Sequence, residues 1–390
     1  MRAIICGAGI GGLSLGWWLA NDGWEVLIVE LAAALRSEGF MLDFFGSGYD
    51  AAELMGLIPR LEELRYPVRR LVYVDGSGQP SSSVEYDVFR HIQKGRLMSL
   101  MRGDLERVLF DALQASVEVR FNLTIRDISE DGASVHVTLS DGTLESADLV
   151  VGADGVHSRV RELVFGSESQ FLRYLGFHTA AFIFRDDGVS NSLDRDFVNL
   201  TVPGRSVGFY SIRDKRIASF FVHRAPDPRI LDSPCSELRR VYGDLRWMVP
   251  TALEHCNESL NVYYDQVAQV EMGRWNRGRV TLIGDACCAV SLLAGQGASV
   301  ALAAAYTLAD ELRHARAVEE ALLRYEARLK PAVARKQMIG RRTAKWVVPP
   351  DHWRIFVRDS VLKLARIRTL SGLLRPVLAG GSESILRRQT

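Results

Sequence analysis

The chain has 390 residues, of which 47% are hydrophobic and 24% charged, with a formal net charge of +1. This length predicts about two domains, the composition is typical of a globular enzyme, and the balanced charge gives no indication of nucleic-acid binding. Gly7 interrupts the apolar residues that follow Arg2, so we expect no secretory signal. The apolar run 286–308 contains Gln296 and two glycines, which favours a buried segment over a membrane span.

The cysteine pattern indicates the compartment. The chain has five cysteines, an odd number without the spacing of a disulfide framework, which fits a reducing cytoplasm. We therefore expect a cytoplasmic protein. Cys287 and Cys288 are adjacent, a spacing that does not suit two ligands of one metal ion, so we interpret them as small buried side chains and expect no metal site.

The first thirty residues carry a dinucleotide-binding pattern. An apolar strand is expected at 2–6, followed by the run GAGIGG and a helix. Gly7 would make the tight turn, Gly9 would let the backbone approach a pyrophosphate, and Gly12 would let the helix pack on the strand. A second apolar strand ends at Glu30, 18 residues after Gly12, where an acid accepts from ribose hydroxyls. This acid favours FAD or NAD over NADP.

A glycine-rich stretch follows at 35–50, which we interpret as a loop that lets the chain pass close to a nucleotide. Arg36 and Asp43 are candidates for contacting it, and the alternative is that both are ordinary surface charges. Farther along, Arg102 precedes a predicted helix that runs to about residue 115, with Asp104 as an acid in its first turn.

Two further strand ends deliver an aspartate. After alternating segments at 117–120, 124–129, 134–140 and 144–146, an apolar strand at 148–151 leads into Asp154. Another apolar strand at 280–283 leads into Asp285. A helix is then expected from Gly297, so Gly295, Gln296 and Gly297 would present free amides at its positive end, which favours an anion or a polarised carbonyl. These strand ends and the glycine motif predict one cofactor site.

The combination resembles the class A flavin-dependent monooxygenases of the p-hydroxybenzoate hydroxylase type. The matching pieces are GAGIGGL with Glu30, Arg102 in MRGDLERVL, VGADGVHSRVR at 151–161 and LIGDA…GQG at 282–297. Within the family, FFGSGYDAAELMGL is most similar to antibiotic-tailoring hydroxylases and tetracycline-inactivating monooxygenases. The resemblance implies an α/β, Rossmann-type FAD-binding domain like that of glutathione reductase. It also implies FAD held by Gly7, Gly9, Gly12, Glu30, Arg102, Asp154 and Asp285.

The resemblance implies the chemistry as well. NADPH would pass a hydride to the flavin, and the family has no second nucleotide-binding fold to hold it. NADH is an alternative reductant. The reduced flavin would react with dioxygen to give a flavin hydroperoxide. The chain departs from the family pattern at Cys288 and Leu292, where an aromatic or His and a Pro are usual. Neutral drift is one interpretation of this departure, and relaxed oxygen transfer, as in a redox-neutral cyclase of the same fold, is the other.

We expect residues 166–270 to form the substrate half as an antiparallel sheet, with apolar runs at 180–184, 197–202, 206–212, 217–223 and 262–267. Candidates for a substrate pocket between this sheet and the flavin are His178, Phe209, Arg213, Phe221, His223 and Tyr264. For each, ordinary sheet packing is the alternative. The many aromatic residues favour a large flat substrate such as a polyketide, and no catalytic base is identified.

The remaining boundaries follow from these motifs. We assign 1–165 to the first part of the FAD-binding domain, 271–315 to its second part, and 316–390 to a C-terminal helical segment, with a helix at about 317–337. Residues 341–390 carry a net charge of +8, from eleven basic and three acidic residues. A membrane-surface helix is possible on this basis, but a segment braced across both domains is favoured.

The leading prediction is an FAD/NADPH monooxygenase, monomeric or homodimeric, acting on a polycyclic small molecule by hydroxylation, epoxidation or Baeyer–Villiger insertion, in antibiotic biosynthesis or inactivation. The alternatives are the redox-neutral cyclase and a protein that sequesters a drug-like ligand without turnover.

Overall fold

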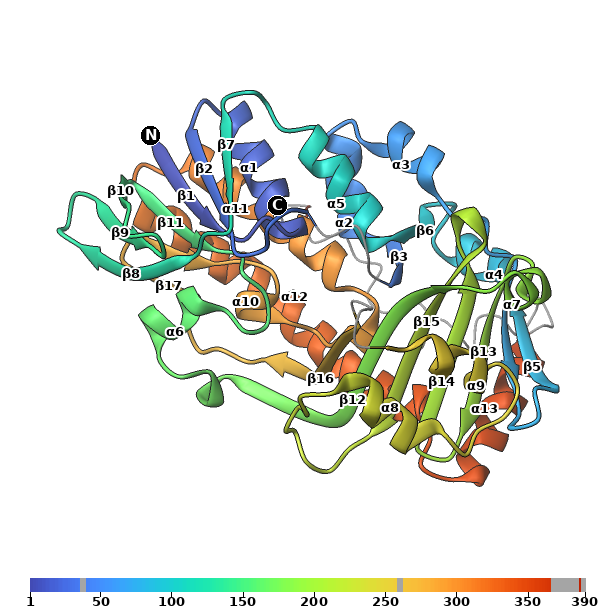
Figure 1. The fold of residues 1–390 in the computed structure, drawn as a ribbon. Helices are drawn as coiled ribbons and strands as arrows, with labels where there is room; N and C mark the ends of the chain where they lie inside the picture. Colours follow the sequence, from blue (N-terminus) through green and yellow to red (C-terminus); the bar gives the residue numbers. More distant parts are fainter. Residues whose placement is uncertain (36–39, 258–261, 366–385, 387–390) are drawn as a thin grey trace.

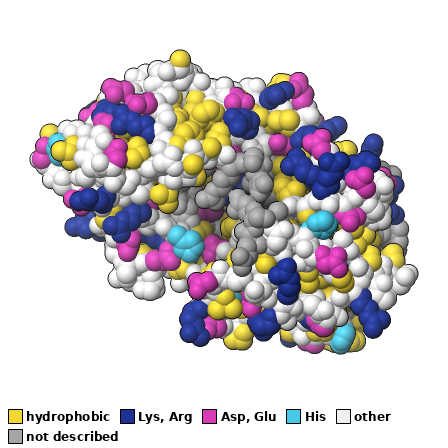
Figure 2. All heavy atoms as spheres, viewed as in Figure 1, with side chains coloured by type: hydrophobic (Ala, Val, Ile, Leu, Met, Phe, Trp, Pro, Cys, Tyr) yellow, Lys and Arg dark blue, Asp and Glu magenta, His cyan; other side chains and the backbone are white. Residues whose placement is uncertain are grey.

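The computed structural model describes residues 1–35, 40–257, 262–365 and 386. Its two main parts lie side by side in Figure 1: a mixed sheet with helices, and a second, larger and mostly antiparallel sheet flanked by helices. Among the described residues, no helix is long and apolar enough to cross a membrane. On the face drawn in Figure 2, basic and acidic side chains lie intermingled, in keeping with the small net charge.

The first sheet is mostly parallel and forms around apolar strands that are buried along most of their length. Its spatial order is β17 (Asn276–Arg277), β18 (Val280–Leu282), β11 (Leu149–Gly152), β1 (Arg2–Cys6), β2 (Glu25–Glu30) and β7 (Val117–Phe121). Only β17 pairs antiparallel within it. Strands with both faces buried read as continuous apolar runs, which is why the sequence locates them well.

Helices α1 (Ile10–Asn21) and α11 (Gly297–His314) pack closely beside this sheet (Figure 1). The two helices meet at Gly11 and Ala301, where a Cβ on Gly11 would lie 3.7 Å from the Ala301 Cβ, an ordinary van der Waals contact. The same apolar core takes in a meander of β8 (Ile125–Glu130), β9 (Val135–Leu139) and β10 (Leu144–Ala147). The other elements of this part are α2 (Ser47–Leu54), α3 (Ile58–Leu64), α5 (Arg102–Asp111), α6 (Arg159–Phe165) and the antiparallel pair of β3 (Met41–Phe45) with β6 (Leu97–Met101).

The second sheet is antiparallel within residues 172–270, as expected for that stretch, and one further pair, between residues 196–200 and 70–74, is parallel. Its order is β16 (Tyr263–Val270), β12 (Leu172–Arg185), β15 (Arg216–Arg224), β14 (Arg205–Ser211), β13 (Asp196–Val202), β4 (Arg70–Val74) and β5 (Pro80–Glu85). Helix α4 (Tyr86–Ile92) follows β5, and α7 (Asp187–Leu193) connects β12 to β13. One face is covered by α8 (Pro234–Tyr242) and α9 (Val249–His255).

Of the two helices from the C-terminal part, the first spans both parts of the molecule and the second lies on the second sheet. Helix α12 (Val318–Val347) begins beside α11, and its last turns pack on β12 and β15 of the second sheet through Ala344 and Val348. Helix α13 (His352–Ala365) lies against β5 and β13. The favoured interpretation of a segment braced across both parts is therefore confirmed for residues 318–365. Most of the basic segment beyond them lies outside the described residues.

The structure corrects several expectations. Strands β4 and β5 belong to the second sheet, although residues 1–165 were assigned to the nucleotide domain; their partner β13 is distant in sequence, so no local pattern indicates it. The stretch 35–50 contains β3 and the start of α2 rather than a continuous loop. The predicted helix at 317–337 continues to Val347.

The cysteine expectation is also corrected. Cys235 and Cys256 form a disulfide between α8 and the end of α9, with Cα atoms 5.6 Å apart. Their separation of 21 positions in the sequence gives no framework spacing, so only the packing of α8 beside α9 reveals the pair. Cys6, Cys287 and Cys288 are free and buried. Cys287 and Cys288 donate to backbone carbonyls such as that of Gly284, as expected for small buried side chains.

Candidate functional site

Three neighbouring parallel strands end at one edge of the first sheet. Strand β11 lies between β1 and β18, so the segments after Cys6, Gly152 and Leu282 meet there. Backbone bonds tie these ends together: the Ala153 amide donates to Cys6 (2.7 Å), and the Ile283 amide to Gly152 (2.9 Å). The carboxyl ends of strands in such a sheet form the ligand crevice. The predicted convergence of strand ends is therefore present.

The glycine motif folds as a turn that admits no side chain at two positions. Gly7 has φ of +110°, a conformation that L side chains rarely adopt. A Cβ on Gly12 would lie 1.9 Å from the Gly7 carbonyl oxygen. Gly9 begins α1, and the nearest atom to its would-be Cβ is Glu106 Oε1 at 3.7 Å. The first turn of α1 is thus open on the side where an anion would bind its amides.

Two side chains border this turn. Glu30 accepts from the Ala8 amide (2.7 Å) and the Ala32 amide (2.9 Å), which fixes its carboxylate under the glycine turn. A carboxylate has about four acceptor positions, so it can still accept from a ribose hydroxyl. On the opposite side of Gly9, Arg102 forms an ion pair with Glu106 (2.9 Å), and about a third of the Arg102 side chain is exposed. Glu106 was not identified from the sequence.

Asp285 lies deep in the fold but keeps an exposed side chain, as expected at the wall of a cleft. A Cβ on Gly297 would lie 3.8 Å from its Oδ1 atom, so the carboxylate stands beside the start of α11. Burial raises the pKa of Asp285, and the positive charge of Arg102 opposes that rise. Helix α10 (Asp285–Cys288) starts at this residue, and Gly295 has the left-handed φ of +63° that turns the chain toward Gln296 and α11.

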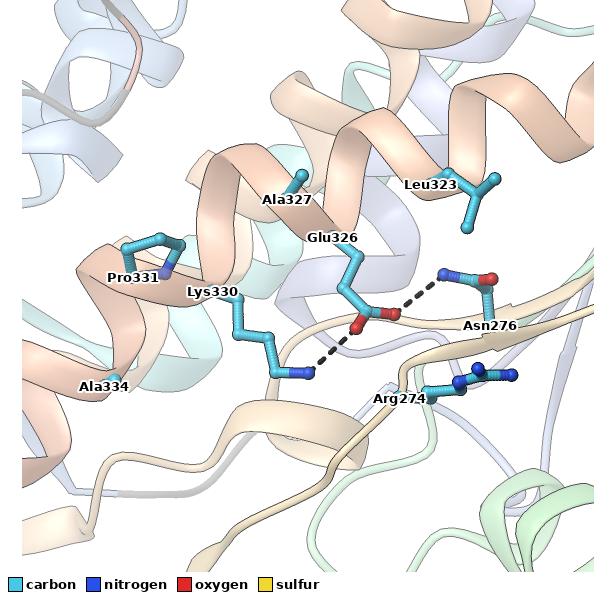
Figure 3. A pocket seen from close by; sticks show the side chains of 8 residues that line it. All are labelled: Arg274, Asn276, Leu323, Glu326, Ala327, Lys330, Pro331 and Ala334. Atoms are coloured by element: carbon cyan, nitrogen blue, oxygen red, sulfur yellow. Dashed lines mark hydrogen bonds and ion pairs between the residues drawn. The ribbon is translucent and has the colours of Figure 1, made fainter.

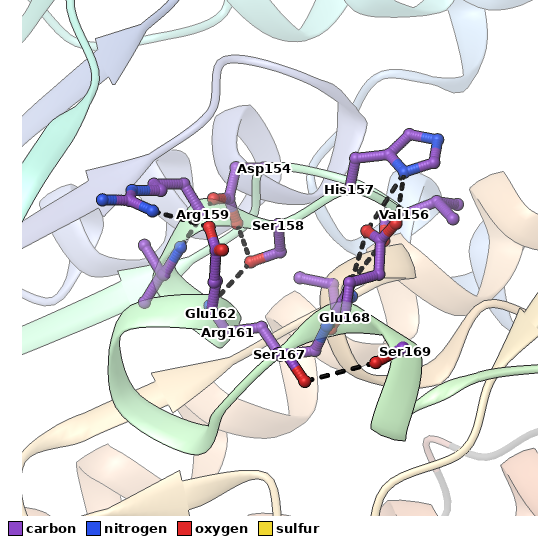
Figure 4. A network of polar contacts seen from close by, with 12 residues as sticks. Asp154, Val156, His157, Ser158, Arg159, Arg161, Glu162, Ser167, Glu168 and Ser169 are labelled. Atoms are coloured by element: carbon purple, nitrogen blue, oxygen red, sulfur yellow. Dashed lines mark hydrogen bonds and ion pairs between the residues drawn. The ribbon is translucent and has the colours of Figure 1, made fainter.

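Asp154 has hydrogen-bond partners within its own segment. Its carboxylate accepts from Ser158 Oγ (2.5 Å) and the Val160 amide (3.0 Å), so it caps the start of α6 (Figure 4). Burial raises its pKa and these hydrogen bonds oppose the rise. Gly7 lies against the backbone of Ala153, the residue before Asp154. The hydrogen bonds of Asp154 therefore hold in place the segment that borders the glycine turn.

The segment after Asp154 links the two sheets. His157 contacts Glu168 (3.1 Å) through Nδ1 and Asp265 of β16 (3.2 Å) through Nε2. The hydrogen bond with Asp265 is the main reason that its pKa rises to about 9. Arg161 is fully buried and donates to the Ala286 carbonyl (3.0 Å) and to Glu168 (3.0 Å), as part of the network in Figure 4.

Five of the six residues expected at the substrate pocket lie on the face of the second sheet that points away from the first part. His178, Phe209, Phe221, His223 and Tyr264 all face α8 and α9. Phe221 stacks with Phe182 (5.5 Å) and meets Tyr242 (5.0 Å). Burial lowers the pKa of both His178 and His223, to about 4 for His223, which suits neutral packing residues.

The opposite face of that sheet looks toward the first part. Phe40, which precedes β3, lies 6.1 Å from Phe220 and 6.1 Å from Tyr263 between ring centres. The Tyr210 hydroxyl accepts from the Met41 amide. Because side chains alternate along a strand, a shift of one residue moves every candidate to the other face. Phe40, Phe220 and Tyr263 were missed for this reason.

The other expected residues have structural partners. Arg213 donates to Asp104 (2.7 Å) and to the Tyr66 hydroxyl (2.9 Å), so it joins the two parts. Asp43 accepts from Ser99 Oγ (3.0 Å) and from the Tyr86 hydroxyl, and burial raises its pKa. Arg36 lies outside the described residues.

A groove of about 530 Å³ runs along the outer side of α12, away from these strand ends (Figure 3). Its polar groups pair with one another: Glu326 contacts Lys330 (2.8 Å) and accepts from Asn276 Nδ2 (2.8 Å). We assign it no function.

The crevice fits FAD. The start of α1 is open and free of side chains, with Glu30 under it and Arg102 beside it. The start of α11 lies next to the exposed carboxylate of Asp285. Together with the large antiparallel sheet, these features define the class A flavin monooxygenase fold. The chain belongs to the FAD binding domain family, whose model matches residues 1–338, and is an FAD-dependent oxidoreductase.

Known proteins are similar over most of the chain. An uncharacterised protein of Mycobacterium tuberculosis is 36% identical over 327 residues, covering 80% of this chain and 85% of its own. A flavin-dependent monooxygenase of Legionella longbeachae is 31% identical and covers 87% of this chain and 88% of its own. Among solved structures, the tetracycline destructase Tet(51) matches with a TM-score of 0.81 and 29% identity, covering 95% of this chain and 97% of its own.

Proposed function

We propose that this protein is an FAD- and NADPH-dependent monooxygenase that transfers one oxygen atom from dioxygen to a flat, polycyclic or polyketide-type small molecule. The observation that carries the proposal is the meeting of Gly9, Arg102 and Asp285 at one sheet edge, opposite an aromatic sheet face. Bound FAD would accept a hydride from NADPH and activate dioxygen. The balance is one NADPH, one dioxygen and one proton consumed, with one water released.

The chain's own residues would bind and orient the cofactor. We propose that the amides at the start of α1 hold the pyrophosphate, with Gly7, Gly9 and Gly12 giving it access. Glu30 would accept from the adenosine ribose, and Arg102 would complement the phosphate charge. Their geometry supports these roles, because each lies at the open side of the turn.

The flavin ring would lie near the start of α11. Asp285 and the amides at Gly297 border that space, and Gly295 and Gln296 shape the turn before it. The positive end of α11 would stabilise negative charge on the reduced ring. The positions Cys288 and Leu292 differ from the family pattern, but Cys288 is buried with its thiol directed to the Gly284 carbonyl.

The substrate would lie between the flavin and the aromatic residues Phe40, Phe220 and Tyr263. Aromatic side chains suit a flat apolar ligand because they bury large area with edge and stacking contacts. The likeness to Tet(51), a tetracycline destructase, supports a polycyclic substrate of this kind.

The test is turnover with labelled dioxygen. Purified protein with FAD, NADPH and a panel of aromatic polyketides should consume NADPH faster with one ligand and yield a product carrying one labelled oxygen atom. Ligand-stimulated NADPH oxidation that yields only hydrogen peroxide and unchanged ligand, for every member of a broad panel, would contradict oxygen transfer.

A further inference from the structure

Helix α12 is bonded to the loop that precedes α11. The Gln337 side-chain amide donates to the carbonyls of Val270 (2.8 Å) and Ala289 (3.1 Å). In return, the Gln269 side-chain amide donates to the Gln337 carbonyl (2.8 Å) and to that of Val290 (2.9 Å). Gln269 and Gln337 are both buried. Such satisfied buried networks fix geometry, so this turn of α12 has a defined position relative to residues 289–297.

Lys336, the residue before Gln337, extends from the same turn to that loop. Its Nζ donates to the Oε1 atom of Gln296, the N-cap residue immediately before α11. Gln296 is only 6% exposed. Burial lowers the pKa of Lys336 to about 8, so the amine is mostly protonated at pH 7.

We propose that Lys336 is a positioning residue for the flavin: its charge, held on Gln296 at the start of α11, stabilises the reduced, negatively charged form of the ring. The inference rests on the proposed FAD site, because it requires the ring to lie at this helix start. A helix N-terminus carries about half a positive charge. A partly buried ammonium group bonded to the N-cap residue adds a full charge at the same end of the helix, where solvent screens it little.

The chain offers a matched control. Lys330 lies on the same helix, but it pairs with Glu326 and stands over the Trp275 ring, at the outer groove of Figure 3. Replacing either lysine with Met removes one positive charge from α12, so the two variants have the same net charge. Of these two lysines, Lys336 is the one bonded to Gln296.

The test measures the two-electron midpoint potential of FAD in the holoenzyme by dye-coupled reductive titration, for the wild type and for Lys336→Met, Lys336→Gln, Lys336→Arg and Lys330→Met. For Lys336→Met we expect the equilibrium to shift about tenfold toward oxidised flavin, which is about 30 mV for a two-electron couple. Lys336→Gln retains a hydrogen-bond donor but no charge, so its midpoint potential should fall by the same amount. Lys336→Arg should restore most of the loss, and Lys330→Met should match the wild type.

An unchanged potential in Lys336→Met, or an equal fall in Lys330→Met, would overturn the inference. If Lys336→Met fails to retain FAD, Lys336→Gln carries the same comparison, and a wild-type potential there would also overturn it. Failure of the proposed function is distinguishable, because it would appear in the wild type as absent FAD binding or absent reduction by NADPH.

Discussion

Two adjacent phenylalanines on β15 allow the assignment of the sheet faces to be tested. Phe221 faces α8 and α9 and is fully buried, while Phe220 faces the first part and is partly exposed. Replacing each with Ala is the same chemical change one residue apart. Phe221→Ala should destabilise the fold without altering the site, and Phe220→Ala should alter the site more than the fold.

The magnitudes follow from what each ring contacts. The Phe221 ring packs against the rings of Phe182, Phe209 and Tyr242. Truncating such a fully buried Phe costs about 3–5 kcal/mol of unfolding free energy. Phe220 contacts Phe40 at 6.1 Å and keeps exposed surface, so its loss should cost about 1–2 kcal/mol.

Urea unfolding followed by circular dichroism gives the stability of each variant, and ligand-stimulated NADPH oxidation gives KM for the ligand. We expect a raised KM for Phe220→Ala and an unchanged KM for Phe221→Ala. Equal stability losses, or a KM change confined to Phe221→Ala, would refute the assignment of the faces.

Three further outcomes are expected. Gly12→Ala should lose FAD, measured as flavin per purified chain, because its Cβ would meet the Gly7 carbonyl at 1.9 Å; full flavin content would contradict the close approach. The folded-state pKa of His157, about 9, lies above its unfolded value of about 6.5. Protonated His157 should contribute about 0.2–1 kcal/mol to the free energy of unfolding, because its ion pairs are exposed. This contribution should be complete below pH 6.5 and vanish as the pH passes 9. Above pH 9, the wild type and His157→Gln should therefore have the same urea midpoint. Removing the Cys235–Cys256 disulfide with a reductant should lower stability by about 2–4 kcal/mol, and an unchanged urea midpoint would contradict its role.

The parts of the fold that the sequence predicted are those with a local signal. The glycine motif, Glu30 and the two strand-end aspartates each stand in a short pattern with a known physical purpose. The five predicted strands of the second sheet were also located, because their apolar runs are bounded by polar turns.

The sequence does not show which face of the second sheet points toward the first part, because the sheet is buried on both faces. Strand β15, with residues IASFFVH at its centre, places apolar side chains on both faces, so alternation carries no polarity signal. A bulge between Tyr174 and His178 also shifts the register of β12 against β16. Lys336 was missed because α12 has basic residues along most of its length, and only tertiary packing singles out one.

The most direct test of the account is an anaerobic titration of the FAD-loaded protein with NADPH, with and without aromatic polyketides. The account predicts bleaching of the oxidised flavin band, faster in the presence of a ligand that is also oxygenated in air. A flavin that stays oxidised with NADPH and with every ligand would contradict the monooxygenase assignment, and would favour a redox-neutral reaction on the same fold.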